Sequence, residues 1–254
     1  MRKPLIAANW KMNKTAGETE AFILAFLPSV REASSVDVII APPFTFLASA
    51  SRLLKTSAVK LAAQNVFYEE KGAFTGEISS SMLIDAGCSL VIIGHSERRQ
   101  YFSETDEIVN KKIKTARKNG LEVILCIGEL LKEREENKTF EVLERQISGS
   151  LKDVSLEGMT IAYEPVWAIG TGKTATPAQA NEAHAFIRQR LKKQYGEAAD
   201  NIRILYGGSV TPENIDSLML EPEVDGALVG GASLKPDSFG KIVEGAKIKL
   251  RSKK

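Results

Sequence analysis

The sequence contains few of the side chains that bind transition metals or form disulfides. Only two cysteines, Cys88 and Cys126, and two histidines, His95 and His184, occur among 254 residues. Two cysteines are too few for a disulfide scaffold or a cysteine metal site, and with so few histidines a zinc site is not expected. The fold must therefore rest on an ordinary hydrophobic core, for which a hydrophobic share of 43% is sufficient.

Long apolar segments and an excess of one charge are also absent. No hydrophobic run approaches the roughly 20 residues that a membrane-spanning helix needs. Residues 1–8 resemble the start of a signal peptide, but Asn9, Lys11 and Asn13 interrupt it too early. The formal net charge is only +2, from 34 basic and 32 acidic side chains, which argues against nucleic-acid binding. We therefore expect a cytoplasmic protein that binds neither nucleic acid nor membrane.

Short apolar segments rich in β-branched residues recur along the whole chain. They are nearly continuous in hydrophobicity, which is typical of strands buried on both faces of a parallel sheet. The eight predicted strands are residues 5–9, 36–41, 59–64, 90–94, 123–127, 160–164, 202–207 and 226–229.

Segments with helical periodicity separate these strands. Residues 106–118 carry apolar side chains on one face. Thr176 opens a capping box with proline at the first helical position, and Thr211 predicts another helix start in the same way. Eight alternating strand and helix units without a linker predict a single (β/α)8 barrel domain, of the α/β class, over residues 1–254.

In such a barrel the functional groups lie where strands end and the following loops begin. Asn9 and Lys11 follow the first predicted strand, His95 follows the fourth, and Glu164 ends the sixth. An amide, an ammonium, an imidazole and a carboxylate therefore converge on one rim. A carboxylate on a rigid strand end suits a general base, and the other groups suit the stabilisation of an oxyanion.

Two pairs of glycines follow the last two strands. Gly207 and Gly208 precede Ser209, and Gly230 is followed by Gly231. Glycine lets the backbone approach a ligand closely and point N–H groups at its oxygens. Tight turns explain either pair alone, but barrels often build a phosphate site after these two strands, so both pairs together favour phosphate binding.

The segment directly after Glu164 has the composition of a lid. It begins with a proline and bulky apolar residues and ends with small ones, so it can close as a rigid body on two joints. A surface loop whose glutamate forms an ordinary ion pair is the alternative interpretation. The predicted lid comprises Pro165, Val166, Trp167, Ala168, Ile169, Gly170, Thr171, Gly172, Lys173, Thr174 and Ala175.

Two nucleotide-binding motifs are matched only in part. Residues 170–175 fit a G-x-G-x-x-A fingerprint, but five residues separate them from the end of the preceding strand. Gly172, Lys173 and Thr174 end like a Walker A loop, but Trp167 stands where the first glycine is required. We therefore exclude both nucleotide sites.

Structural interpretations remain open for single residues. Lys11 could be an ordinary surface lysine, and His95 could be a hydrogen-bonded core histidine. His184 lies in the middle of a charged helical segment and is interpreted as structural. Cys126 lies near the rim, but no histidine is near it in sequence, which favours a packed thiol over a nucleophile.

Taken together, the rim segments resemble the triosephosphate isomerase family. The segments are AANWKMN at 7–13, IIGHSERR at 92–99, AYEPVWAIGTGKTATP at 162–177, ILYGGSV at 204–210 and ALVGGASL at 227–234. With AAQN and GAFTGE between residues 62 and 77, the resemblance covers nearly the whole chain. It implies a homodimer without a cofactor or metal that interconverts dihydroxyacetone phosphate and D-glyceraldehyde 3-phosphate, in glycolysis and gluconeogenesis.

The resemblance also implies a role for each catalytic residue. Glu164 would be the base that moves a proton between the two carbons beside the carbonyl. His95 would polarise the carbonyl and shuttle protons among the enediolate oxygens. Lys11 would supply a fixed positive charge and Asn9 a hydrogen bond, with Glu97 as a partner behind them.

Two further sets of residues follow from the same resemblance. The long loop that contains Phe74 and Thr75 would dock beside the site of the other subunit, which agrees with its length and its aromatic side chains. The phosphate would be held by backbone N–H groups of Gly170, Ser209, Gly230 and Gly231.

Two other functions compete with this one. The first is a different barrel enzyme that acts on a phosphorylated sugar or an indole precursor and shares only the phosphate end. It gives no reason for the sequence Glu-Pro-Val-Trp after the sixth strand. The second is a non-catalytic sensor of phosphorylated metabolites, which predicts the glycine pairs but not the combination of Lys11, His95 and Glu164.

The lid leads to a first testable prediction. Replacing residues 169–172 by a short linker should lower turnover, because the reacting groups stay in contact with water. Methylglyoxal and free phosphate should appear as side products, because the lid no longer holds the intermediate in the plane that retains its phosphate. A substrate without the phosphate should be nearly indifferent to the change. A rise in KM alone, with unchanged turnover and no methylglyoxal, would reduce the lid to a substrate clamp.

Overall fold

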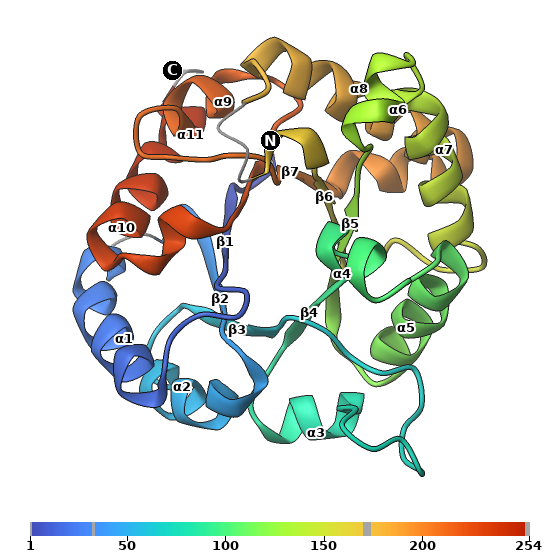
Figure 1. Ribbon diagram of the computed structural model, residues 1–254. Helices are drawn as coiled ribbons and strands as arrows, with labels where there is room; N and C mark the ends of the chain where they lie inside the picture. Colours follow the sequence, from blue (N-terminus) through green and yellow to red (C-terminus); the bar gives the residue numbers. More distant parts are fainter. Residues whose placement is uncertain (1, 32–33, 170–173, 252–254) are drawn as a thin grey trace.

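The computed structural model describes residues 2–31, 34–169 and 174–251. Its eight strands form a closed parallel barrel in which each strand pairs with its neighbours in sequence and β8 pairs with β1 (Figure 1). The predicted barrel is thus confirmed, and no predicted strand end is wrong by more than one residue. The strands are β1 Leu5–Asn9, β2 Asp37–Ala41, β3 Lys60–Ala63, β4 Leu90–Ile93, β5 Glu122–Ile127, β6 Met159–Tyr163, β7 Arg203–Tyr206 and β8 Gly226–Val229.

The helices form a ring around the barrel (Figure 1). None of those in the described part of the chain is long and apolar enough to cross a bilayer. The α-helices are α1 Ala16–Val30, α2 Leu47–Leu54, α3 Ser80–Asp85, α4 Ser96–Tyr101, α5 Asp106–Lys118, α6 Leu131–Glu135, α7 Thr139–Ser150, α8 Pro177–Tyr195, α9 Ile215–Leu220, α10 Pro236–Gly245 and α11 Ile248–Arg251. The 3-10 helices within the described residues are η1 Phe44–Phe46, η2 Val166–Ala168, η3 Gly196–Asn201 and η4 Gly231–Leu234.

Two of the three predicted helix starts are correct. Helix α5 has the predicted bounds, and α8 begins at Pro177 behind the capping residue Thr176. The start predicted at Thr211 is wrong, because α9 begins only at Ile215. Residues 211–214 form a separate turn before the helix, in which the N–H groups of Asn214 and Ile215 donate to the Thr211 carbonyl at 3.3 and 3.2 Å.

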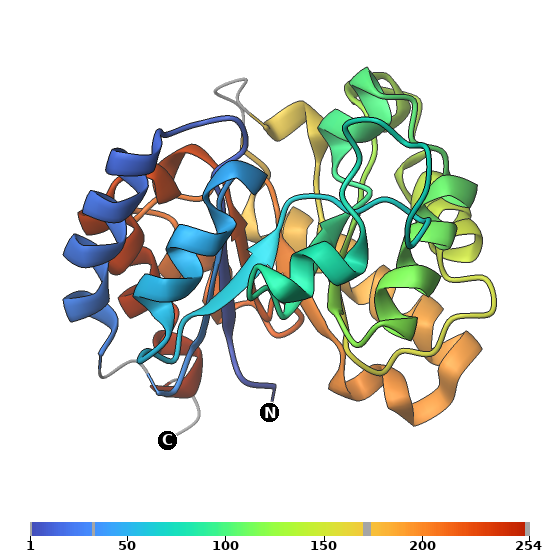
Figure 2. The same cartoon turned by 90° about the horizontal axis from the view of Figure 1, so that it is seen from below.

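The core consists of two layers. One fills the barrel interior with side chains such as Leu5, Ile92 and Leu205, and the other lies between the strands and the helices. In the outer layer, helices from the two ends of the chain pack together. Helices α1 and α10 lie side by side, in blue and red in Figure 2. Phe26 of α1 contacts Phe239 of α10 there, with ring centroids 5.0 Å apart. This packed scaffold fixes the strand ends that carry the site.

Candidate active site

The polar residues predicted at the strand ends border one cavity. This cavity of about 270 Å³ is lined by Asn9, Lys11, His95 and Glu164. The backbone segments after β7 and β8 complete its wall, through Gly207, Gly208, Ser209, Gly230 and Gly231 among others. The structure therefore brings together the candidate catalytic side chains and the candidate phosphate-binding glycines, apart from Gly170, which lies outside the described residues.

The Glu164 carboxylate is buried, with only 1% of the residue exposed. Its Oε2 accepts a hydrogen bond of 2.9 Å from the Ser96 N–H, and its Oε1 lies 2.9 Å from His95 Nε2. Burial works to raise the pKa of the carboxyl group. The contact with His95, the Ser96 N–H and the charge of Lys11 outweigh burial, so the pKa lies below its ordinary value. In this position Glu164 is ionised at neutral pH.

The His95 ring is oriented by the start of α4. His95 is the N-cap of this helix, and its Nδ1 accepts the Glu97 N–H at 3.2 Å. Because Nδ1 acts as an acceptor, the ring proton of the neutral imidazole is on Nε2, which points to Glu164. Burial works to lower the pKa of His95, but the Glu164 carboxylate outweighs it and raises the pKa above its ordinary value. A second ring proton on Nδ1 would nevertheless displace the Glu97 N–H, so in this geometry the ring is neutral and donates through Nε2.

Lys11 has an unusual backbone conformation, with φ at 53°. Its N–H donates to Asn9 Oδ1 at 3.1 Å, and its carbonyl accepts from Gln64 Nε2 at 2.9 Å. The ammonium forms an ion pair of 2.7 Å with Glu97 Oε1. Asn9 and Glu97 thus both contact Lys11. Gln64 had no assigned role in the sequence analysis, although it directly follows β3.

Glu129 is the most important residue that the sequence analysis missed. Its buried carboxylate accepts hydrogen bonds from Tyr163 Oη at 3.1 Å, Trp167 Nε1 at 2.9 Å and Arg134 at 3.2 Å. Its carbonyl accepts the Val166 N–H at 3.1 Å. The available signal was its position, because Glu129 follows β5 on the same rim as the other candidates.

The described part of the lid begins as a short, stiff element. Pro165 caps η2, and the Ala168 N–H donates to the Pro165 carbonyl at 2.7 Å. Ile169 lines the site cavity and Ala175 is buried. The predicted lid residues Gly170, Thr171, Gly172 and Lys173 lie outside the described residues.

The loop predicted to contact a second subunit is ordered by its own aromatic rings. Phe67 stacks on Tyr68 and contacts Phe74, with centroid distances of 4.2 and 4.7 Å. Phe74 is still 41% exposed, and its neighbour Thr75 is exposed as well. Figure 1 shows this loop projecting outward between β3 and α3.

Two titratable side chains are structural. His184 is fully buried, with Nδ1 3.2 Å from the Glu223 carbonyl, and burial lowers the pKa of this histidine to about 3. Cys126 is also fully buried inside the barrel, and burial raises the pKa of its thiol well above the ordinary value. A protonated, buried thiol is a poor nucleophile, so both structural interpretations agree with the geometry.

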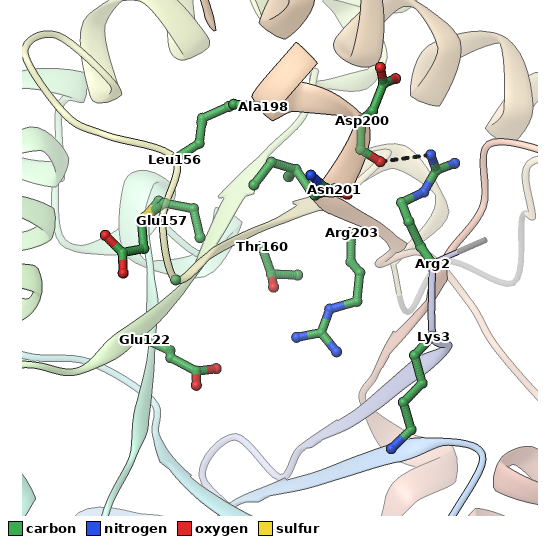
Figure 3. Close-up of a pocket in the computed structure, with 13 residues that line it drawn as sticks. Arg2, Lys3, Glu122, Leu156, Glu157, Thr160, Ala198, Asp200, Asn201 and Arg203 are labelled. Atoms are coloured by element: carbon green, nitrogen blue, oxygen red, sulfur yellow. Dashed lines mark hydrogen bonds between the residues drawn. The ribbon is translucent and has the colours of Figure 1, made fainter. Parts of the chain in front are cut away.

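A larger cavity, of about 870 Å³, lies at the opposite end of the barrel (Figure 3). It is lined in part by residues at the starts of strands, and its cationic side chains pair with carboxylates that lie outside the lining. Lys3 and Arg203 both lie 2.6 Å from Asp37, and Arg2 lies 2.7 Å from Asp225. Polar groups at this end of a barrel usually serve stability, so we do not assign a ligand to this cavity.

Comparison with known proteins identifies the family. The family model described as triosephosphate isomerase matches residues 4–246. The chain belongs to the triosephosphate isomerase family. It is similar to the triosephosphate isomerase of Geotalea uraniireducens, with 59% identity over 96% of this chain and 98% of the relative. The triosephosphate isomerase of Endomicrobium trichonymphae is 55% identical over 97% and 100% of the two chains.

A solved structure agrees with these relatives. The crystal structure of triosephosphate isomerase from Bartonella henselae superposes with a TM-score of 0.90 and 41% identity, over 96% of this chain and 99% of that one. Membership of the triosephosphate isomerase family confirms the predicted fold and the predicted class of enzyme, an isomerase. Neither the other phosphosugar enzyme nor the sensor finds support among these relatives.

The hydrogen bond between Ser96 and Glu164 generates a second prediction. Ser96 is the first residue of α4, and His95 before it has φ −51° and ψ 141°, a conformation that the residue before a proline readily adopts. The proline Cδ takes the place of the N–H hydrogen, so the Glu164 carboxylate must also move away from position 96. Ser96→Pro removes the N–H donor to the carboxylate, and loss of such a donor raises the pKa of Glu164. The acid limb of the pH profile of kcat/KM should therefore move to higher pH.

Ser96→Ala is the matched control, because it keeps the N–H donor to Glu164.

The free energy of unfolding should also differ between the proline and alanine variants. The folded-state pKa of Glu164 is lowered, so the carboxylate stabilises the fold above its unfolded pKa of about 4.3, and this contribution is lost as the pH falls. The proline variant should therefore lose part of this stabilisation at neutral pH. Identical pH profiles for the proline and alanine variants would contradict this account of the site.

Proposed function

We propose that this protein interconverts dihydroxyacetone phosphate and D-glyceraldehyde 3-phosphate by proton transfer through an enediolate. One observation carries the proposal. A buried carboxylate, a neutral imidazole and an ammonium, those of Glu164, His95 and Lys11, border the same cavity as the backbone of Gly230 and Gly231. The cavity thus offers groups for proton transfer and for a phosphate in one small volume.

The chemistry follows from the groups. Glu164 removes a proton from the carbon beside the carbonyl, and the electron pair left behind places negative charge on the carbonyl oxygen. The Nε2–H of His95 and the ammonium of Lys11 stabilise this charge, because both are fixed before the reaction begins. Return of the proton from Glu164 to the neighbouring carbon, with His95 moving the proton between the two oxygens, completes the isomerisation without loss of an atom.

The basicity of Glu164 depends on where the carboxylate lies. Next to Ser96 and His95 its pKa is lowered, so it is a weak base there. A movement toward substrate would release the Ser96 N–H, while burial would remain and raise the pKa. We therefore infer that the position beside Ser96 is a resting position and that the carboxylate becomes basic when it leaves it.

The phosphate would be held by backbone N–H groups rather than by a cation. We assign this role to Ser209, Gly230 and Gly231, and to Gly170 of the lid. Lys11 lies close to this end of the cavity, because a Cβ added to Gly230 would be 3.5 Å from Lys11 Cε. A single ammonium can thus act on the developing oxyanion and attract the dianionic substrate.

The lid, residues 165–175, would close over the bound substrate, and Glu129 would hold its first turn until then. The hydrogen bond of Trp167 to Glu129 and the guanidinium of Arg134, 4.7 Å above the Trp167 ring, stabilise the present position. Closure would exchange these contacts for contacts with the phosphate.

The test is turnover by the Glu164→Gln variant, measured with an assay coupled to a nicotinamide-dependent dehydrogenase. The amide keeps the shape of the side chain but cannot accept the proton. We expect kcat to fall by about 10²–10⁴-fold or more, the scale of a general base. Glu20→Gln, on the exposed face of α1, is the matched control and should turn over normally. Near-normal turnover by Glu164→Gln would reject Glu164 as the base.

We also propose that the protein is a cytoplasmic homodimer, with the loop of Phe74 and Thr75 beside the partner's site. Support comes from the apolar side chains that this loop and its neighbours expose to solvent. Met12 is 96% exposed, Tyr101 70% and Phe102 63%. They follow β1 and β4, which end on the same rim as β3, and large exposed apolar groups on one rim are typical of a protein–protein contact.

Phe74→Asp tests the dimer. A charge in the middle of an apolar contact carries a desolvation cost, so the variant should be monomeric in light scattering and much less active. Phe140→Asp is the matched control, because Phe140 on α7 is exposed to the same degree (39%) and should remain dimeric. A dimeric Phe74→Asp protein of unchanged stability, or a fully active monomer, would contradict the proposed interface.

A further inference from the structure

Lys14 makes an uncommon set of contacts between two loops at the rim. Its φ is 76°, a backbone conformation that favours glycine. The ammonium donates a hydrogen bond of 2.9 Å to the carbonyl of Leu234, which is 220 residues away in sequence. It also lies 5.1 Å from the ring of Trp10 and 4.8 Å from the ring of Phe22, within the range of a cation–π contact.

The carbonyl that Lys14 contacts belongs to the phosphate end of the site. Leu234 is the last residue of η4, and this short helix begins at Gly231, directly after Gly230. Within it, the Ser233 hydroxyl contacts the carbonyls of Val229 and Gly230 at 3.0 and 2.7 Å. The carbonyls at the end of a helical turn lack partners, so a cation there stabilises the turn as a unit.

The two aromatic rings that face the Lys14 ammonium are firmly packed. Trp10 is fully buried directly after β1, and its ring meets Phe22 of α1 edge to face at 4.8 Å. Lys14 thus connects η4 to the end of the strand that carries Asn9 and Lys11. Lys14 itself does not line the cavity.

We propose that Lys14 is a positioning residue that holds η4 in the place where the N–H groups of Gly230 and Gly231 meet the substrate phosphate. The inference rests on the phosphate site of the proposed function. It explains why a lysine stands where the backbone would be less strained with glycine, since the ammonium makes contacts that glycine cannot. Its removal should weaken phosphate binding and leave the proton-transfer groups in place.

The primary test uses Lys14→Met, which keeps an unbranched apolar side chain and loses the charge. KM and the competitive inhibition constant of inorganic phosphate should both rise, by about 5–10-fold. Turnover at saturation should change by less than about twofold, because the lost contact acts on ground state and transition state alike. Lys14→Arg should retain most of the affinity. Lys111→Met, which removes an exposed ammonium 5.9 Å from the Tyr68 ring, is the control and should change neither constant.

Lys14→Gly separates positioning from stability. Glycine relieves the positive φ, so the melting temperature should stay the same or rise, while the affinity for inorganic phosphate should fall as in Lys14→Met. A purely structural lysine would instead make affinity follow stability across the series.

Two results would overturn the inference in distinguishable ways. Unchanged phosphate affinity in Lys14→Met and Lys14→Gly, with competitive inhibition intact in the unmodified protein, would show that Lys14 does not position η4. Absence of competitive inhibition by inorganic phosphate in the unmodified protein would show that the proposed phosphate site itself is wrong.

Discussion

The site depends on the close packing of backbone around Glu164 at the end of β6. The Glu164 N–H donates to the Ile127 carbonyl at 2.7 Å, and the Gly207 N–H donates to the Tyr163 carbonyl at 2.7 Å. A Cβ at Gly128 would lie 1.7 Å from the Glu164 carbonyl oxygen, and one at Gly207 would lie 2.9 Å from Glu164 Cγ. Positions 128 and 207, which flank Glu164, must therefore be glycine. The carboxylate between them is directed toward His95 and Ser96.

This packing also joins the carboxylate to the lid. Glu129, next to Gly128, holds the first turn of the lid through its carboxylate and its carbonyl. Pro165 is the single residue between Glu164 and that turn, and its ring fixes its φ. A movement of the lid away from Glu129 should therefore be transmitted to the backbone of Glu164. This offers a mechanical reason why the carboxylate would leave Ser96 when the lid closes.

Much of the fold was predictable because it depends on local pattern. Strands buried on both faces are nearly continuous in hydrophobicity, so their ends were found to within one residue. The start of α9 was predicted too early, because Thr-Pro suits the beginning of a turn as well as the beginning of a helix. Predicted rim residues such as Lys11 and Glu164 meet for the same topological reason: parallel strands of one barrel end on one rim.

The contacts that hold these residues in place could not be read from the sequence, because they join distant segments. Ser96 and Glu164 are 68 residues apart, and Lys14 and Leu234 are 220 apart. A positive φ also cannot be predicted from the sequence when the residue is not glycine. At Lys11 and Lys14 such a backbone costs about 1–3 kcal/mol each, which only surrounding contacts can offset. One of these ammonium groups borders the cavity and the other reaches Leu234, so at both positions the side chain makes a contact that glycine, the residue the backbone favours, could not make.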